Sequence, residues 1–231
     1  MTLRTVGLLG GMTYHSTVDY YKDINDQVAA ALGGLTSAPM VLDSINFAEY
    51  AAMQKANQWD QLGEMMAGRA QRLEAAGAQG IAICTNLMHK VAPAVQAAVT
   101  VPLLHIVEAV ATQAKAKGIR RLGILGAPWT MTEDWYSDPL ITAGLEVVRA
   151  NDQDIETNRR VIFDELGQGI ISDKSRDDLV KVIERLASAG ADGVALSCTE
   201  LPLILSDRTS PLPTVNSTVA HVQACTRFIL N

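Results

Sequence analysis

The chain repeats one pattern at an interval of about half its length. AGAQGIAICTN begins at Ala76 and AGADGVALSCTE begins at Ala189, and both lead through an apolar run to Cys-Thr and a polar side chain. Other similar positions keep nearly the same spacing, such as Gly10 and Gly126, which are 116 residues apart. Two copies of one structural unit are the economical explanation of a spacing that drifts so little.

Within each copy, apolar runs bounded by glycine alternate with stretches of helical spacing. We expect strands at 5–10, 40–45, 80–84, 102–106, 121–126, 145–149, 193–198 and 212–215, and helices at 16–31, 59–76, 88–99, 132–143, 156–166, 176–189 and 217–229. This alternation predicts an α/β fold in which helices cover both faces of parallel sheets. We expect the last strand and helix to return to the first lobe, so the predicted domains are 1–101 with 213–231, and 102–212.

Composition narrows the class of protein. The 231 residues carry 48% hydrophobic side chains and a formal net charge of −6, which argues against nucleic acid or an anionic membrane surface as a partner. No apolar run approaches the ~20 residues of a membrane span, and the N-terminus lacks the features of a signal peptide. Three cysteines do not suggest a disulfide framework. We therefore expect a cytoplasmic protein with reduced thiols.

The repeated cysteines, Cys84 and Cys198, each end a predicted strand. Ligands of open parallel sheets bind beyond the carboxyl ends of the strands. If the lobes are related by a pseudo-twofold axis, the two thiols face each other across one cleft. Inversion at a carbon by proton transfer requires a base on one face and an acid on the other, and two thiols can fill both roles. We expect a helix N-terminus to lower each thiol pKa from ~8.5 towards neutrality.

Other interpretations of these and neighbouring residues are weaker. A cysteine that ends an apolar strand is most often a small buried hydrophobe, and Cys225 fits that description because it has no polar motif and no counterpart. Cys84 and His89 lack the second ligand pair of a metal site, so no metal is expected. His105 and His221 are expected to be packing or hydrogen-bonding residues. GLLGG is not a dinucleotide fingerprint, and Lys90 is a remote candidate for a pyridoxal Schiff base.

Several stretches together resemble the aspartate/glutamate racemase superfamily, in particular its cofactor-independent amino-acid racemases. They are VGLLGGMTYHSTVDYYKDIN, ALGGLTSAPMVLDSINFAEYAAMQ, CTNLMHKVA, LGILGAPWTMTEDWY and SCTE, and they run over nearly the whole chain. The resemblance implies two Rossmann-like lobes with the active site in the cleft between them, commonly in a homodimer. It also implies a two-base mechanism that uses no pyridoxal phosphate and no other cofactor.

The resemblance also assigns roles to individual residues. Cys84 and Cys198 match the two catalytic cysteines. The residues that match substrate contacts are Met12, Thr13, Gln54, Thr85, Asn86, Thr130, Arg160, Thr199 and Glu200, with Arg160 offered as the cation near a distal carboxylate. The chain departs from its relatives at His15, Thr36, Leu87, Ala127 and Asn216, which lie in or around the implied pocket. These departures concern the side chain that the pocket accepts.

The predicted function is racemisation of aspartate or glutamate by proton transfer at Cα between two cysteines. A hydantoin racemase or a maleate isomerase of the same superfamily is the nearest enzymatic alternative. A two-lobed protein that binds an amino acid without catalysis is the non-enzymatic alternative, because a fold does not fix a function. For the racemase and for the binding protein the expected partner is a small-molecule amino acid, whereas a hydantoin racemase or a maleate isomerase would use a cysteine on a different substrate.

Overall fold

The computed structural model describes residues 2–231, which divide into two compact units. The first unit contains the residues up to Ile106 together with His221–Asn231, and the second is Val107–Ala220. The first unit is thus built from two separate segments, with limits at 106 and 221 where the sequence suggested 101 and 213.

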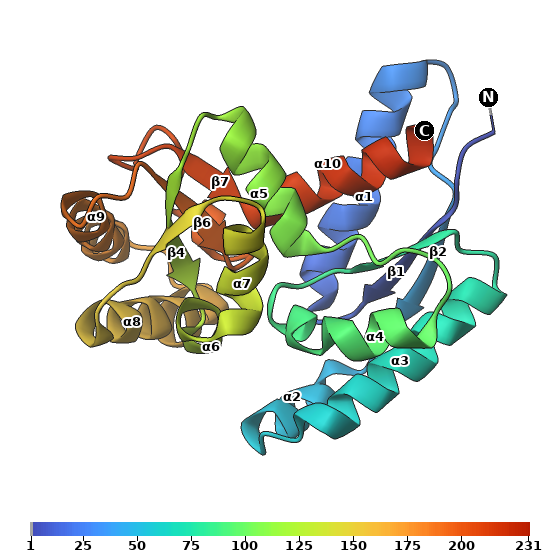
Figure 1. Cartoon of the computed structure of the whole chain (residues 1–231), viewed down its shortest axis with the longest axis horizontal. Coiled ribbons are helices and arrows are strands. Elements are labelled where there is room, and N and C mark those ends of the chain that lie inside the picture. The colour runs from blue at the N-terminus through green and yellow to red at the C-terminus, as the bar shows by residue number, and fades with distance from the viewer. Residues whose placement is uncertain (1) are drawn as a thin grey trace. The chain divides into compact units, whose positions relative to one another are not determined.

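The first unit is built on a three-stranded parallel sheet, ordered β2-β1-β3 (Figure 1). Its strands are β1 (Val6–Gly10), β2 (Met40–Ser44) and β3 (Gly80–Ile83). The helices are α1 (Tyr14–Leu32), α2 (Phe47–Lys55), α3 (Trp59–Ala75), the 3-10 helix η1 (Leu87–Val91), α4 (Ala92–Ala98) and α10 (Ser217–Leu230). α1 begins at Tyr14, two residues before the start of the helix expected at 16–31.

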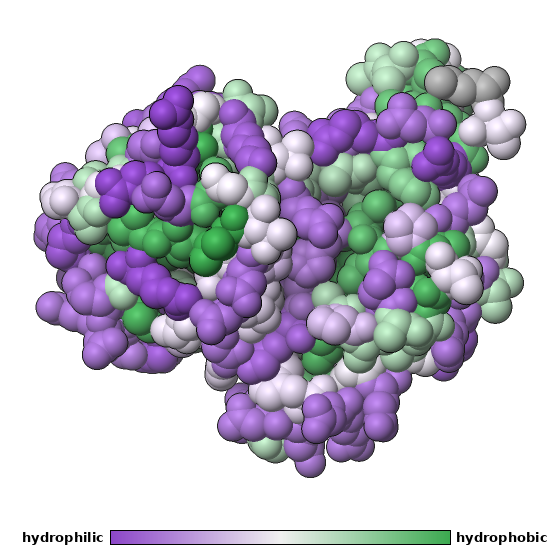
Figure 2. All heavy atoms as spheres, in the orientation of Figure 1, coloured by the Kyte–Doolittle hydropathy of each residue, from purple (hydrophilic) through white to green (hydrophobic). Residues whose placement is uncertain are grey.

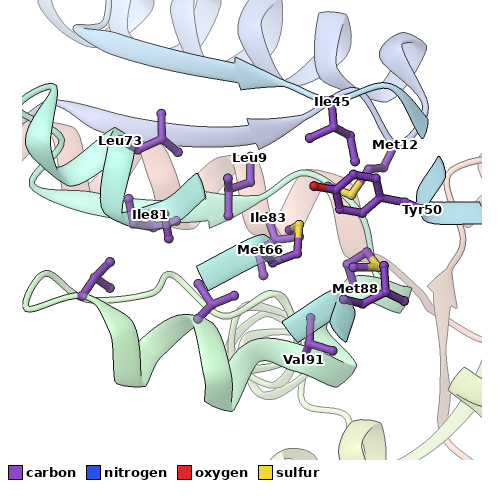
Figure 3. Packing of buried hydrophobic residues seen from close by; sticks show 14 of the residues in the cluster. Leu9, Met12, Ile45, Tyr50, Met66, Leu73, Ile81, Ile83, Met88 and Val91 are labelled. Carbon is purple, nitrogen blue, oxygen red and sulfur yellow. The ribbon is translucent and has the colours of Figure 1, made fainter. Parts of the chain in front are cut away.

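Strand alternation divides the core of this unit between the two faces of the sheet. Leu9 and Ile83 lie in the cluster that contains α3 and α4, where Figure 3 shows them among buried side chains. Leu8 and Ala82 point to the opposite face and pack with residues of α1 and α10. Because side chains alternate along a strand, Cys84 follows Ala82 onto the α1 and α10 face. The sheet therefore carries helices on both sides, as the sequence predicts.

The second unit is built on a four-stranded parallel sheet, ordered β5-β4-β6-β7. Its strands are β4 (Arg121–Gly126), β5 (Glu146–Val148), β6 (Gly193–Ser197) and β7 (Thr214–Asn216). Around it lie α5 (Ile106–Ala116), α6 (Pro128–Thr132), α7 (Asp134–Thr142), α8 (Asp152–Arg159), the π-helix η2 (Arg160–Glu165), the 3-10 helix η3 (Leu166–Gln168), α9 (Asp173–Ser188) and the 3-10 helix η4 (Leu201–Leu203).

The two sheets share one topology, which is the structural form of the repeat. In each sheet the first strand of the copy is paired with the second on one side and with the third on the other. β7 extends the second sheet beside β6, so its predicted place in the first lobe is wrong. The strand predicted at 102–106 is reduced to a single bridge between Ile81 and Leu103, because α5 already begins at Ile106.

Apolar residues reach the surface of both units. Figure 2 shows hydrophobic patches among hydrophilic side chains on the face that it draws. Exposed large apolar side chains include Tyr14, Val18 and Tyr21 on α1, and Ile171 and Leu203 in the second unit. None of the helices in residues 2–231 is long and apolar enough to cross a membrane. The homodimer implied by the sequence stays a prediction.

Candidate active site

Cys84 lies in the turn that follows β3, beside the end of β1. Its backbone N–H donates to the carbonyl of Leu9 at 2.9 Å, which continues the ladder one residue past the strand. The side chain is fully buried and packs with Tyr20 and Cys225. Burial, with a smaller effect of Cys225, raises the pKa of the Cys84 thiol well above its ordinary value. The predicted lowering by a helix terminus is wrong here, because a short 3-10 helix follows and desolvation dominates.

Cys198 occupies the equivalent place in the second unit, after β6 and beside the end of β4. Its thiol is partly buried and donates to Oε2 of Glu200 at 2.9 Å. The hydroxyl of Thr199 donates to the same oxygen at 2.9 Å. Burial first, and then the neighbouring Glu200 carboxylate, raise the pKa of the Cys198 thiol well above its ordinary value. The structure therefore brings together Cys198, Thr199 and Glu200, and gives this thiol a proton acceptor.

The end of β4 adds polar groups close to Cys198. Gly126 is the register partner of Ser197, and a Cβ at Gly126 would lie 3.3 Å from the side chain of Thr130. The Thr130 hydroxyl is buried and has no hydrogen-bond partner in the described part of the chain. A buried hydroxyl in this state is suited to bind a polar group of a ligand. The Ser197 hydroxyl itself is bound to Tyr136 at 2.5 Å, a contact that the sequence did not reveal.

The predicted contacts on the first unit are only partly grouped. The Gln54 amide donates to the sulfur of Met88 at 3.1 Å, which places α2 beside the segment that follows Cys84. Met12 is buried in the core, and Figure 3 shows it pointing towards Tyr50. A contact between Met12 and a substrate would therefore have to use its backbone. Thr13 is exposed at the start of α1, and its side chain does not cap the helix.

Arg160 is already committed to acidic residues of its own unit. Its guanidinium pairs with Glu165 and, at 2.7 Å, with Asp178, and Lys174 binds Asp178 as well. The side chain is about one third exposed, at 35%. Two carboxylates of the protein therefore already bind this guanidinium. Its role towards a distal substrate carboxylate stays a prediction.

The turn after Cys84 is held by a buried histidine that the sequence motif CTNLMHK contains. Nδ1 of His89 lies 2.8 Å from the carbonyl oxygen of Thr85, and Asn86 is buried next to it in the same turn. Nε2 of His89 accepts from the backbone N–H of Ile106 at 3.1 Å. Among residues 2–231, no group of three or more histidine, cysteine or acidic side chains is arranged to hold a metal ion.

Comparisons with known proteins agree with this arrangement. A family model described as Asp/Glu/hydantoin racemase matches residues 9–225. A crystal structure of a candidate Asp/Glu racemase from Yersinia pestis is 39% identical, with a TM-score of 0.95 over 99% of this chain and 100% of that one. An aspartate racemase homologue from Pyrococcus horikoshii is 32% identical, with a TM-score of 0.86 over 99% and 100% of the two chains.

More distant matches say less about function. An uncharacterised protein of Pectobacterium carotovorum is 31% identical over 118 residues, which is 50% of this chain and 77% of that protein. A glutamate racemase from Francisella tularensis, at 11% identity and a TM-score of 0.65, covers 100% of this chain and 82% of its own. An arylmalonate decarboxylase, at 18% identity and a TM-score of 0.52, covers 97% and 92%. The last two share the fold alone, so they leave the substrate open.

Proposed function

Because the chain belongs to the Asp/Glu/hydantoin racemase family, we propose that it racemises an acidic amino acid, aspartate or glutamate, without a cofactor. The observation that carries this proposal is the equivalent placement of two thiols. Cys84 follows β3 and Cys198 follows β6, and these strands hold the same position in two sheets of the same order. An acidic substrate is supported by the similarity to the Yersinia and Pyrococcus proteins.

The environments of the two thiols differ, and we assign them different roles in the resting enzyme. Cys198 donates to Glu200, so a proton acceptor is already in place to convert it to a thiolate. The pKa values of both thiols are raised, but Cys84 packs in a cluster of buried apolar side chains, whereas Cys198 has the Glu200 carboxylate beside it. Cys198 is therefore the first base and Cys84 the first acid.

Racemisation then requires removal of the proton from Cα on one face and delivery of a proton to Cα on the opposite face. The Cys198 proton moves to Glu200, and the resulting thiolate takes the α-proton while the Cα–H bond breaks. Cys84 donates its S–H proton to the opposite face of the carbanion and becomes the thiolate. Hydrogen-bond donors such as the Thr130 hydroxyl stabilise the charge that develops on the substrate carboxylate. Cys198 is then a thiol again, and proton exchange with solvent removes the proton from Glu200 and restores the one on Cys84.

Exchange of the α-proton in D₂O tests the proposal. The reduced protein is incubated with L-aspartate and separately with L-glutamate, and the α-proton signal is followed by NMR while the enantiomers are separated by chiral chromatography. We expect loss of the α-proton together with appearance of the D-isomer. The variants Cys84→Ala and Cys198→Ala are each expected to abolish racemisation.

Cys225→Ala is the matched control, because Cys225 is a buried thiol on α10 that has no strand-end motif. It is expected to retain racemisation. Activity that survives in either Cys84→Ala or Cys198→Ala contradicts the two-base mechanism. Binding of an acidic amino acid without exchange of its α-proton would identify a binding protein. Turnover of a 5-substituted hydantoin or of maleate would instead identify a hydantoin racemase or a maleate isomerase of the same superfamily.

A further inference from the structure

His89 connects the turn that carries Cys84 to the segment where the chain leaves the first unit. It is buried, with 1% of its surface exposed, in the 3-10 helix just after the Cys84–Asn86 turn. One ring nitrogen faces the carbonyl of Thr85, and the other accepts the N–H of Ile106, the last residue before the second unit begins. Both ring nitrogens are therefore occupied by backbone groups.

These partners determine which nitrogen carries the proton. A backbone N–H can only donate, so Nε2 of His89 must be the unprotonated acceptor, and a carbonyl can only accept, so Nδ1 must carry the hydrogen. Burial, with smaller effects from His105 and His221, lowers the pKa of His89 well below its ordinary value, so the ring stays neutral. A ring bound in this way has no free nitrogen for a metal or for proton transfer.

The segment that His89 holds is fastened at two further points. The N–H of Leu104 donates to the carbonyl of Ile81 in β3 at 2.7 Å. The carbonyl of Leu104 accepts from Nε2 of His221 at 2.5 Å, while Nδ1 of His221 accepts the Tyr20 hydroxyl at 2.7 Å. His221 is the residue at which the chain re-enters the first unit. The chain passes between the units after Ile106 and again before His221. A buried histidine is thus involved at both points, since His89 binds Ile106 and His221 is itself the second point.

The histidine rings also touch one another. The ring centroids of His89 and His221 are 5.6 Å apart, and those of His89 and His105 are 4.7 Å apart, both pairs edge to face. A displacement of the segment 104–106 would therefore be resisted both by hydrogen bonds and by ring packing. The Cys84–Asn86 turn shares these constraints through the bond from the His89 ring to the carbonyl of Thr85, while the backbone N–H of His89 donates to the carbonyl of Asn86 at 3.0 Å.

We infer that His89 is a positioning residue for the reaction: it fixes the Cys84–Asn86 turn to the crossing segment 104–106 through its two ring nitrogens. The bond to Thr85 sets where the turn presents Cys84, and the bond from Ile106 ties that turn to the chain crossing. This role deepens the proposed function and, where it concerns rate, rests on it. The inferred tether itself does not depend on which substrate the protein uses.

The first test needs only the wild-type protein. The chain has four histidines, so selective ¹⁵N labelling of histidine gives a spectrum simple enough to assign. We expect His89 as a neutral ring protonated at Nδ1, which faces the Thr85 carbonyl, and His221 as a neutral ring protonated at Nε2, which faces the Leu104 carbonyl. A His89 ring protonated at Nε2, or one that becomes charged between pH 7 and 6, would overturn the inference.

Two substitutions separate the two side-chain bonds of His89, the first to the Thr85 carbonyl and the second from the Ile106 N–H. In His89→Asn the amide nitrogen stands near the place of Nδ1, so the bond to Thr85 is retained and the acceptor for Ile106 is lost. In His89→Gln the amide oxygen reaches the place of Nε2, so the acceptor for Ile106 is retained and the bond to Thr85 is lost. His89→Leu removes both. Amide hydrogen exchange at Ile106 reports the bond from Ile106 to residue 89 and needs no substrate. It should be faster in the Asn and Leu variants than in the Gln variant.

Racemisation kinetics report the bond between the residue 89 side chain and the Thr85 carbonyl. We expect kcat to fall by about 10- to 100-fold in His89→Gln, since a displacement of about 1 Å at a reacting group costs this much, with a smaller change in KM. The loss in His89→Asn should be clearly smaller. Equal losses in the Asn, Gln and Leu variants would reduce His89 to a packing residue and refute the positioning role. If the wild type does not racemise at all, the proposed function fails, while the ring protonation and the Ile106 exchange rates still decide the tether.

Discussion

Replacing Glu200 by Gln separates two effects that this carboxylate has on Cys198. The thiol lies 2.9 Å from Oε2 of Glu200, and the carboxylate contributes to the raised pKa of the thiol. A negative charge opposes formation of a thiolate beside it, yet the same charge makes Glu200 a base that can take the thiol proton. The substitution therefore makes the thiolate easier to form and removes the group that the mechanism uses to form it.

The electrostatic effect can be bounded from the geometry. Two unit charges at the observed separation interact by about 1.4 kcal/mol in bulk water and by about 6 kcal/mol at an effective dielectric constant of about 20. Because Cys198 and Glu200 are both partly exposed, the lower bound is the appropriate one. Removing the carboxylate charge in Glu200→Gln should therefore lower the pKa of the Cys198 thiol.

Two assays then move in opposite directions. Alkylation of Cys198 by iodoacetamide, mapped by mass spectrometry, should speed up at fixed pH, since the larger thiolate fraction outweighs its lower nucleophilicity. Racemisation should slow by about 10²- to 10⁴-fold, the usual contribution of a general base. Cys84 and Cys225 are buried, so Cys198 is the thiol expected to react.

Glu64→Gln is the matched control, because it removes an exposed carboxylate from α3 and should change neither rate. The decisive comparison is between the two assays on one protein. If racemisation by Glu200→Gln holds steady or rises while alkylation accelerates, Glu200 only raises the thiol pKa, and its assignment as the base is refuted.

Two further predictions concern stability. Burial lowers the pKa of His221 to about 4, below the ordinary 6.5, so only the unfolded chain binds this proton between pH 6.5 and 4. The free energy of unfolding should therefore decrease as the pH is lowered, by about 2 kcal/mol for His221 between pH 7 and 5. A wild-type free energy of unfolding, measured by urea denaturation, that does not change between these pH values would contradict this. Tyr136→Phe removes the buried bond to Ser197 and should cost about 1 to 3 kcal/mol, checked by urea denaturation. Ser197→Ala in the same background should then add little, and full additivity would show that the bond does not contribute.

The sequence predicts the repeated sheets because their signals are local. β1 and β4 are short apolar runs that end in glycine, and β3 and β6 are short apolar runs that lead to the two Cys-Thr motifs. The segment 102–106 has the same composition and still fails as a strand, because the pairing of Leu103 is cut short by the helix that begins at Ile106. The place of β7 beside β6 is likewise decided by pairing between distant residues, which periodicity does not report.

The polar partners inside the site were less predictable for the same reason. Tyr136 and Ser197 are 61 residues apart, and Tyr20 and His221 are 201 apart, so no local pattern joins either pair. His89 is the exception, since it stands in the motif CTNLMHK four residues after Thr85, a spacing that allows a ring to reach back to that carbonyl. Its second partner, Ile106, became visible only through the fold.

The largest error of the sequence interpretation concerns the thiols, and it changes how the reaction begins. A helix N-terminus was expected to hold at least one cysteine near its thiolate, but Cys84 and Cys198 are followed by short 3-10 helices and lie in desolvating surroundings that raise both pKa values. Neither thiol is a ready base in the free protein. Under the proposed mechanism the thiolate therefore forms only when a proton leaves for Glu200, and the ammonium group of a bound amino acid supplies a positive charge that favours this step. A pH profile of kcat that rises at a pH well below the rise in alkylation of Cys198 in the free protein would locate the activation in the substrate complex, whereas coincident rises would place the thiolate in the free enzyme.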